Sequence, residues 1–493
     1  MERLTTGIPG LDTLLRGGVF KGGIYMIQGA PGAGKTILAN QLCFAHAAGG
    51  GKALYVTLLA ENHSRLIGHL QSFAFFDDTA VPSLVSYISA FNILEEQGLE
   101  GLLETLRREI RKSGISLLIL DGLVSAEETA NTPRELKKFI NELQTQAGLT
   151  NCTIFMLTSA YMSQRLVAAE HTMVDGLIEL RGRPIGRRAE RGIEIQKFRG
   201  SATLPGLHAF AISDAGVEIY PRIESLFAWP SIPSGFDGEA TSTGIDSLDA
   251  LFEGGPARHS GTLLLGPAGI GKTTFGLHFL GPEPGVCLSF SEMGEALRDK
   301  AARMKLPAAE RFDRGELEVI WQPVTEASVD ELCHRLLRTI ETTRAKRLFI
   351  DGLDGFQKIA GETDRIGPLL TALMNQLRGM GVTTLASTET DIAGIVPGQP
   401  LAGLALRDLS PVADNIVVMR MASAGSSLQR LLTVLKSRDN RTDLRFRRFD
   451  IRDDGVFIED QPENAALLMS GTPATLPPLS GAAEPPDELG RGG

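Results

Sequence analysis

The sequence predicts an α/β protein with two tandem domains, each a mostly parallel β-sheet flanked by helices and bordered by an antiparallel edge. Landmarks of the first half of the chain return in the same order in the second half, which indicates a duplicated domain. Within each half, short apolar runs such as ALYVTLL and SLLILDG alternate with helical patterns such as LEGLLETLRREIRK, as in parallel strands buried on both faces. Each half ends in several strand-like runs without helices between them, which predicts the antiparallel edge.

The composition is that of an ordinary globular protein with more than one core. The chain has 493 residues, 43 % of them hydrophobic, and 49 Lys and Arg against 59 Asp and Glu, a net charge of −10. This charge argues against general affinity for nucleic acid backbones. The four cysteines have no CxxC spacing, and we find neither a secretion signal nor a membrane-length apolar run. We therefore expect a cytoplasmic protein without a membrane span.

The internal repeat is visible as pairs of matching segments. The opening GIPGLDTLLRGG, residues 7–18, returns as GIDSLDALFEGG, residues 244–255. Further along, the apolar run LLILDGL around Asp121 matches RLFIDGLDG around Asp351. Because the spacing between matching segments stays nearly constant, the repeat covers most of each half.

Proline-rich segments mark the limits of the two copies. Residues 221–241 hold three prolines among small and polar residues, which is typical of a linker. Residues 461–493 hold six prolines and no aromatic residue, so this segment cannot bury enough surface to order itself alone. We therefore expect domains over 1–220 and 242–460, a linker over 221–241 and a disordered tail over 461–493.

Two segments match the pattern GxxxxGK[ST], each directly after an apolar strand-like run and before a helical one. Glycines let the main-chain N–H groups of such a loop face inward, where they can bind phosphate at the helix N-terminus. A lysine then supplies positive charge to the β- and γ-phosphates, and a threonine hydroxyl suits Mg²⁺. A glycine-rich turn with a solvated lysine is the alternative, which two matches at equivalent places disfavour. The predicted nucleotide-binding residues are Gly29, Ala30, Pro31, Gly32, Ala33, Gly34, Lys35 and Thr36 in the first copy, and Gly266, Pro267, Ala268, Gly269, Ile270, Gly271, Lys272, Thr273 and Thr274 in the second.

Four carboxylates stand where they could complete these two sites. Asp121 and Asp351 each end an apolar run, which places them at the carboxyl edge of the sheet beside the phosphate loop. The predicted Mg²⁺ ligands are Thr36, Asp121, Thr273 and Asp351. Glu61 and Glu292 follow the second strand of each copy, where a carboxylate could orient or deprotonate the attacking water. A turn-capping Asp and a solvated Glu that begins a helix are the structural alternatives.

The paired motifs resemble those of the KaiC-like two-domain ATPases of the RecA superfamily. The resemblance runs from Gly7 to Ile458 and rests on the opening segment, GAPGAGKT, ILDG, the strands VDGLIEL and ADNIVVM, and KFRG with KSRD. It implies two RecA-like domains, hydrolysis of ATP with Mg²⁺, a hexameric double ring with nucleotide at subunit interfaces, and a signalling or Kai-type regulatory partner. It also implies that a Lys-x-Arg pair reaches the neighbouring subunit's nucleotide in each copy, here Lys197 with Arg199 and Lys436 with Arg438.

The sequence departs from the pattern of the family's clock members at two places. Those members carry two adjacent glutamates after the second strand, whereas this chain has Ala60-Glu61 and Ser291-Glu292. Members that phosphorylate themselves carry adjacent Ser and Thr, whereas this chain has Ser410 followed by Pro411, so Ser410 is the one remaining candidate phosphoacceptor. A serine autokinase activity is thus an open hypothesis.

Two other functions use the same core and stay open. The first is a RecA/RadA- or helicase-like DNA-dependent ATPase, in which clustered arginines would contact phosphates. We instead expect these arginines at subunit contacts or facing solvent, since aromatic residues for base stacking are sparse nearby, and we do not expect a nucleic acid partner. The second is a nucleotide-gated scaffold for a signalling protein. The two arginine clusters are Arg181, Arg183, Arg187, Arg188 and Arg191, and Arg441, Arg445, Arg447 and Arg448.

Overall fold

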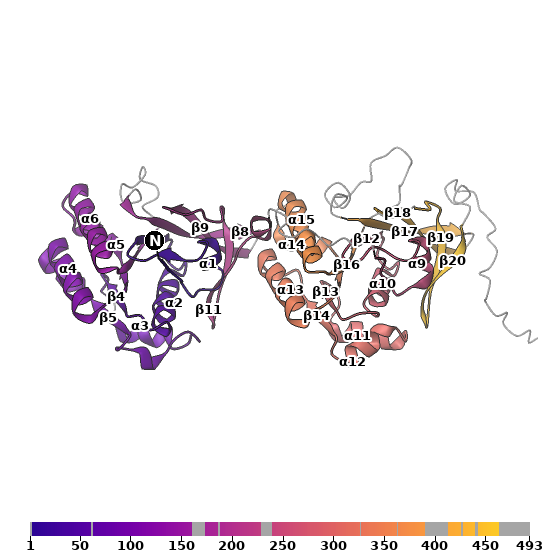
Figure 1. The fold of residues 1–493 in the computed structure, drawn as a ribbon, viewed down its shortest axis with the longest axis horizontal. Helices are drawn as coiled ribbons and strands as arrows, with labels where there is room; N and C mark the ends of the chain where they lie inside the picture. Colours follow the sequence, from indigo (N-terminus) through magenta and orange to yellow (C-terminus); the bar gives the residue numbers. More distant parts are fainter. Residues whose placement is uncertain are drawn as a thin grey trace, which may run out of the picture. The chain divides into compact units, whose positions relative to one another are not determined.

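The chain folds into two compact domains, one built from residues 1–228 with 328–334 and the other from the remaining residues (Figure 1). The computed structural model describes residues 2–60, 63–159, 173–185, 188–227, 239–325, 327–361, 363–389, 413–424, 427–438 and 442–462. Most of the predicted linker and tail, as well as Glu61 and Ser410, lie outside these residues.

The first domain is built on a nine-stranded sheet in the order β11-β10-β9-β8-β3-β7-β6-β4-β5. The strands from β5 to β8 are parallel, whereas β9, β10 and β11 pair antiparallel, as the sequence predicts. Two short strands, β1 and β2, form a separate antiparallel pair. The strands are β1 (Arg3–Leu4), β2 (Val19–Phe20), β3 (Ile24–Gly29), β4 (Ala53–Thr57), β5 (Val85–Ser89), β6 (Leu117–Asp121), β7 (Thr153–Ser159), β8 (Gly176–Ile185), β9 (Arg188–Phe198), β10 (His208–Ser213) and β11 (Gly216–Tyr220).

Helices cover both faces of this sheet. Those described are α1 (Leu11–Leu14), α2 (Lys35–Ala48), α3 (His63–Leu70), α4 (Phe91–Ser113), α5 (Leu123–Thr129), α6 (Pro133–Thr150) and α8 (Ile223–Leu226), with a 3₁₀ turn at Asp78–Ala80. Local capping sets the ends of α6: the Thr132 hydroxyl accepts the Glu135 N–H, Pro133 starts the helix, and Asn151 ends it in a left-handed conformation.

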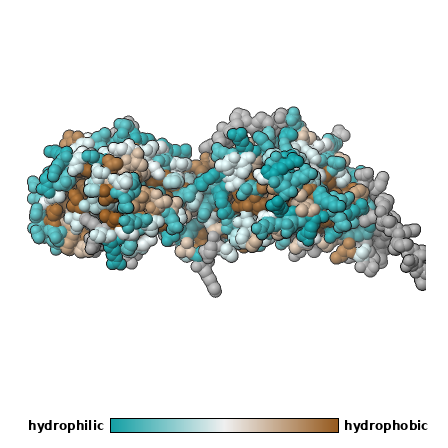
Figure 2. Space-filling model, turned by 90° about the horizontal axis from the view of Figure 1, so that it is seen from below, coloured by the Kyte–Doolittle hydropathy of each residue, from teal (hydrophilic) through white to brown (hydrophobic). Residues whose placement is uncertain are grey.

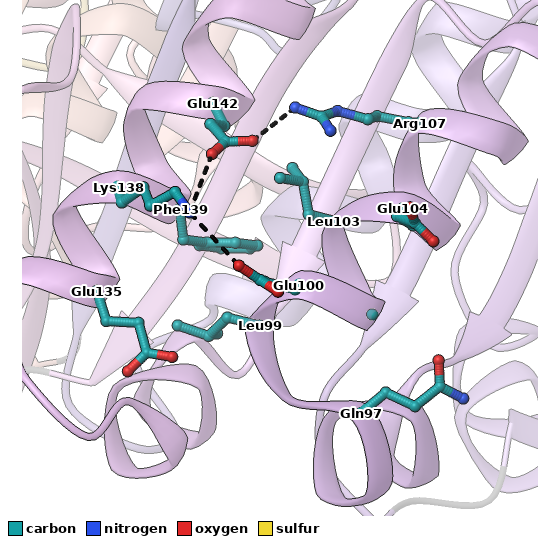
Figure 3. A pocket seen from close by; sticks show the side chains of 11 residues that line it. Gln97, Leu99, Glu100, Leu103, Glu104, Arg107, Glu135, Lys138, Phe139 and Glu142 are labelled. Atoms are coloured by element: carbon teal, nitrogen blue, oxygen red, sulfur yellow. Dashed lines mark hydrogen bonds and ion pairs between the residues drawn. The ribbon is translucent and has the colours of Figure 1, made fainter.

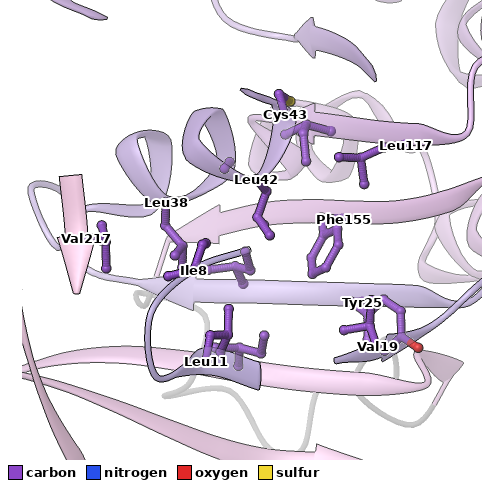
Figure 4. Packing of buried hydrophobic residues seen from close by; sticks show 14 of the residues in the cluster. Ile8, Leu11, Val19, Tyr25, Leu38, Leu42, Cys43, Leu117, Phe155 and Val217 are labelled. Atoms are coloured by element: carbon purple, nitrogen blue, oxygen red, sulfur yellow. The ribbon is translucent and has the colours of Figure 1, made fainter. Parts of the chain in front are cut away.

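The alternation of side chains along the strands divides the core of the first domain in two. Tyr25 and Ile27 of β3 point to one face, where α1 and α2 pack, while Ile24 and Met26 point to the other, where α4, α5 and α6 pack. Figure 4 shows the first of these layers, with Leu38 of α2 among its residues. Apolar strands buried on both faces are the expected consequence of a parallel sheet covered by helices.

The second domain repeats this architecture with a sheet in the order β14-β13-β15-β16-β12-β17-β18-β19-β20. Strands β14 to β17 are parallel, and β18, β19 and β20 form the antiparallel edge. The strands are β12 (Gly261–Gly266), β13 (Gly285–Ser289), β14 (Leu317–Trp321), β15 (Arg347–Asp351), β16 (Thr383–Glu389), β17 (Asn415–Ala424), β18 (Ser427–Lys436), β19 (Arg447–Arg452) and β20 (Gly455–Pro462). The described helices of this half of the chain are α9 (Asp246–Leu251), α10 (Lys272–Phe279), α11 (Gly294–Arg303), α12 (Pro307–Asp313), α13 (Val329–Thr343), α14 (Asp354–Ala360) and α15 (Thr363–Gly379); the part of α13 up to His334 is grouped with the first unit.

The surface of both domains mixes polar and apolar residues. On the face drawn in Figure 2, hydrophilic residues are interspersed with smaller hydrophobic areas. Among the helices of the described residues, none combines the length and apolar character that crossing a membrane requires.

Candidate functional site

Each phosphate loop connects the central strand of a sheet to the helix that follows, β3 to α2 and β12 to α10. Gly32 and Gly34, like Gly269 and Gly271, have φ between +74° and +112°, which a glycine adopts without strain. A side chain at Gly32 or Gly269 would meet no atom within 4 Å, so the main chain there faces open space. The loops therefore present their N–H groups to a ligand at a helix N-terminus.

The lysine of each loop points back over its own main chain. The Lys35 Nζ donates hydrogen bonds of 2.7 and 3.1 Å to the first two carbonyl oxygens of its loop. The Lys272 Nζ makes the same two bonds at 2.8 and 2.9 Å. Burial lowers the pKa of both ammonium groups, while nearby carboxylates oppose that shift. Both lysines are thus partly desolvated cations beside an open backbone cradle, which suits a phosphate.

In the second domain, a threonine and an aspartate meet beside the lysine. The Thr273 hydroxyl donates to Asp351 Oδ2 at 2.9 Å, and the Ser387 hydroxyl donates to Asp351 Oδ1 at 2.9 Å. Asp351 ends β15 and is 7 % exposed; burial raises the pKa of its carboxyl, while the two hydroxyl donors lower it. A hydroxyl and a carboxylate at this distance form an all-oxygen pair of the kind that binds Mg²⁺.

In the first domain, a tyrosine joins the equivalent threonine and aspartate. Tyr55 is buried in β4; its hydroxyl donates to Asp121 Oδ2 and has a hydrogen bond to the Thr36 side chain. Burial and the Asp121 charge raise the pKa of the Tyr55 phenol well above 10.0. Cys287 of β13 occupies the position of Tyr55 in the second domain, since both residues are third in strands that pair alike. Tyr55 is not among the site residues predicted from the sequence, although this alignment of the two copies could have marked it.

Glu292 lines the cleft beside the phosphate loop of the second domain, here called the second cleft, and pairs with a lysine. Its main-chain N–H donates to the Ser289 hydroxyl at 3.0 Å, and its Oε1 lies 3.5 Å from the Lys300 Nζ of α11. The equivalent Glu61 of the first copy lies outside the described residues. Lys300 is not among the site residues predicted from the sequence, because a side chain two turns along a helix is not part of any local motif.

The second cleft has a volume of about 530 Å³ and gathers several charged groups that the motifs do not contain. Asp354, Lys358 and Glu389 line it together with the loop, Glu292 and Lys300. The Glu389 N–H donates to Asp354 Oδ2 at 3.0 Å, which connects the end of β16 to the start of α14. Acidic and basic side chains therefore face the same space, as expected where phosphates and a cation meet.

The two Lys-x-Arg pairs occupy equivalent places on the antiparallel edges. Lys197 lies near the end of β9, and Lys436 ends β18. The Lys436 Nζ donates to the Ala413 carbonyl at 2.7 Å, and an Arg438 guanidinium nitrogen lies 3.0 Å from Asp414. Burial and the Arg199 charge lower the pKa of the Lys197 ammonium. The arginine of each pair is exposed, so it could contact a second molecule.

Most described members of the two arginine clusters face carboxylates. Arg181 and Arg183 each lie 2.6 Å from a glutamate of their own hairpin. Arg445 and Arg447 lie 2.8 and 2.7 Å from Asp443. Arg187 and Arg441 lie outside the described residues. These ion pairs would have to break before the arginines could bind nucleic acid phosphates, which weakens the case for that function.

A second cavity lies between α4 and α6 of the first domain, with a volume of about 470 Å³ (Figure 3). Its charged residues largely satisfy one another: the Lys138 Nζ lies 3.4 Å from Glu100 and 4.0 Å from Glu142, and Arg107 lies 2.6 Å from Glu142. The cavity is formed by helices that the sequence predicts only as an amphipathic pattern, so its lining could not be foreseen.

Comparison with known proteins agrees with this geometry. The family model of the KaiC ATPase matches residues 4–224 and, a second time, residues 241–463. The circadian clock oscillator protein KaiC of Picosynechococcus sp. is 24 % identical over 501 residues, covering 97 % of this chain and 93 % of that protein. The circadian clock protein KaiC3 of Synechocystis sp. is 25 % identical over 504 residues, which cover 96 % of this chain and 95 % of that protein. Because the family model matches both domains, the chain belongs to the KaiC family of two-domain ATPases in the RecA superfamily.

Proposed function

We propose that this protein binds ATP with Mg²⁺ in both domains and hydrolyses it. The observation that carries the proposal is the second cleft, where the Thr273 hydroxyl meets Asp351 at 2.9 Å beside the partly buried Lys272. A hydroxyl, a carboxylate and a loop ammonium at one helix N-terminus fit a nucleoside triphosphate with its divalent cation.

Each group has a distinct role in this proposal. The N–H groups of the two loops and the ammonium groups of Lys35 and Lys272 bind the phosphates and stabilise charge that develops on the γ-phosphoryl group. Thr273 with Asp351, and Thr36 with Asp121 in the first domain, would hold Mg²⁺, which would supply positive charge to the phosphates. Glu292, like Glu61, orients the attacking water.

We propose further that the chain assembles into a hexameric double ring with nucleotide between subunits. Support comes from the family and from the exposed position of Arg199 and Arg438 on the antiparallel edges. With Lys197 and Lys436, these arginines would reach the nucleotide of a neighbouring subunit and stabilise charge there. A Kai-type or other signalling protein is the proposed partner, and slow ATP turnover would then switch assembly or partner binding.

Particle size and ATPase rate, measured together, test this proposal. Wild type, Lys35→Ala, Lys272→Ala and the double variant are compared by light scattering with and without ATP and Mg²⁺. We expect each single variant to lose one class of nucleotide site and the double variant to lose both. Heat of ATP binding that persists in the double variant would overturn the assignment of the two loops. A wild type that stays monomeric in every nucleotide state would overturn the shared-site assembly.

In addition to ATP hydrolysis, we propose that the protein phosphorylates its own Ser410. Ser410 lies outside the described residues, and the adjacent proline leaves one hydroxyl where self-phosphorylating relatives carry two. Prolonged incubation with ATP and Mg²⁺, followed by phosphopeptide mass spectrometry, tests it with Ser410→Ala as the control. Absence of phosphate from Ser410 in the wild type would exclude the autokinase while leaving the ATPase intact.

A further inference from the structure

The second cleft contains a cation that belongs to no phosphate-binding motif. Lys300 lies in α11, and its ammonium group lies 3.5 Å from Glu292, the proposed water-orienting carboxylate. Both side chains are partly shielded, with exposed fractions of 27 % for Lys300 and 35 % for Glu292. Both also line the cleft formed by the phosphate loop. An ion pair in this place therefore faces the space that the phosphates would fill.

Lys300 interacts with carboxylates that a more negatively charged ligand could replace. Burial raises the pKa of Asp351 and the Lys300 charge lowers it, so Lys300 acts on a second carboxylate of the cleft besides Glu292. A partly exposed ion pair of this kind is weak, which allows one partner to exchange.

The two domains differ at this position. Lys300 follows Glu292 by eight residues, and the residue eight positions after Glu61 is His69. His69 lies in α3 and is exposed. At this count from the glutamate, the second domain thus has a lysine that lines its cleft, whereas the first domain has a shorter, exposed side chain.

We propose that Lys300 is the residue by which the second cleft distinguishes a nucleoside triphosphate from a diphosphate; the inference rests on the proposed ATPase function. In the nucleotide-free protein, Lys300 holds Glu292 in an ion pair. When a triphosphate enters, the ammonium moves to an oxygen of the γ-phosphate, which carries more negative charge than a carboxylate. Glu292 is then released to orient water. A diphosphate lacks the γ-phosphate and leaves the Lys300–Glu292 pair in place.

The difference between ATP and ADP affinity measures this role directly. The experiment uses the full chain with Lys35→Ala, so that only the second cleft binds, and titrates it with ATP or ADP in the presence of Mg²⁺ by calorimetry. We expect Lys300→Gln to weaken ATP binding about tenfold or more, as for the loss of a charge-assisted hydrogen bond, and to leave ADP affinity within about twofold. Lys300→Arg keeps the positive charge and should keep most of the preference for ATP.

The matched control is Arg303→Gln, which removes the same charge from an exposed position of the same helix outside the cleft lining. Arg303→Gln should change neither the affinity for ATP nor the affinity for ADP. Unchanged ADP binding by Lys300→Gln also reports an intact fold of the cleft. Equal loss of ATP and ADP affinity, or no loss of either, would overturn the role of Lys300. Failure of the Lys35→Ala parent to bind ATP would instead overturn the proposed function itself.

A double-mutant cycle tests the exchange of partners. Glu292→Gln removes the competitor for the ammonium, so ATP affinity should rise several-fold in the Lys35→Ala chain. The same change should have no effect on ATP affinity when Lys300 is already glutamine. Independent effects of the two substitutions would show that Glu292 and Lys300 do not compete, and the exchange would be wrong.

Discussion

A buried histidine should make the stability of the second domain depend on pH. His278 lies in α10 and is 7 % exposed. Its Nδ1 lies 3.2 Å from the Gly244 carbonyl, and its Nε2 accepts the Val456 N–H at 3.1 Å. Only the neutral ring with its proton on Nδ1 satisfies both partners, because a protonated Nε2 would face an N–H donor. Burial accordingly lowers the pKa of His278 below its usual 6.5, although the bond to Gly244 opposes the shift.

The direction of the effect follows from proton linkage. Below pH 6.5 the unfolded chain protonates this histidine while the folded chain does not, so stability falls as the pH falls, until the lower pKa of the folded state is reached. The slope cannot exceed about 1.4 kcal/mol of unfolding free energy for each pH unit within that window. Well above pH 6.5 both states are neutral and the contribution of His278 is constant.

His278→Gln should abolish this dependence at little cost near neutral pH. The first domain has Gln41 at the equivalent position, where its side chain bonds both backbone groups of Val217, at 3.2 and 2.7 Å. A glutamine can therefore accept the Val456 N–H in the same way. We expect the free energy of unfolding of the second domain to fall by at most about 1 kcal/mol in this variant at pH 7.5.

Urea unfolding at pH 7.5, 6.5 and 5.5 measures the effect. Trp321 of β14 reports on the second domain once Trp229→Phe has removed the other tryptophan. Between pH 6.5 and 5.5 the free energy of unfolding of the parent should fall relative to that of His278→Gln, by up to about 1 kcal/mol. His69→Gln, at an exposed position of the first domain, should leave the slope unchanged. A pH-independent difference between parent and His278→Gln would refute the reasoning.

Three further substitutions test other parts of the structure. Arg347→Met removes four hydrogen bonds made by a side chain that is 2 % exposed. The free energy of unfolding of the second domain, measured in urea, should therefore fall by about 3 kcal/mol or more. A decrease below about 1 kcal/mol would contradict this expectation. Gly271→Ala places a Cβ 2.2 Å from Ile451 at a φ of +112°, and it should lower the melting temperature more than Gly315→Ala, which has a φ of +68° and open space. Tyr55→Phe should raise about tenfold the Mg²⁺ concentration that half-saturates ATP binding at the first phosphate loop, measured in a Lys272→Ala chain; an unchanged Mg²⁺ requirement would count against it.

Much of the fold and part of the candidate site could be predicted from the sequence. The phosphate loops are contiguous, so their residues and spacing specify a turn between a strand and a helix wherever the domain folds. Asp351 could be placed beside its loop because parallel strands end at the same edge of a sheet. The antiparallel edges follow from runs such as GIEIQKF and HAFAIS that have no helix between them. The roles of these residues stay predictions, as do those of Glu61 and Ser410.

Only the tertiary structure decided which side chains complete each cleft. Tyr55 reaches Asp121 in one domain, whereas Ser387 and Thr273 reach Asp351 in the other, although the surrounding motifs are nearly the same. The contact between Lys300 and Glu292 likewise depends on the direction of α11 relative to the segment that joins it to β13. Such contacts depend on strand register and on the packing of helices against the sheet, which join residues far apart in the chain. Local sequence determines which backbone elements form, but the distances between side chains on different elements exist only once those elements have packed.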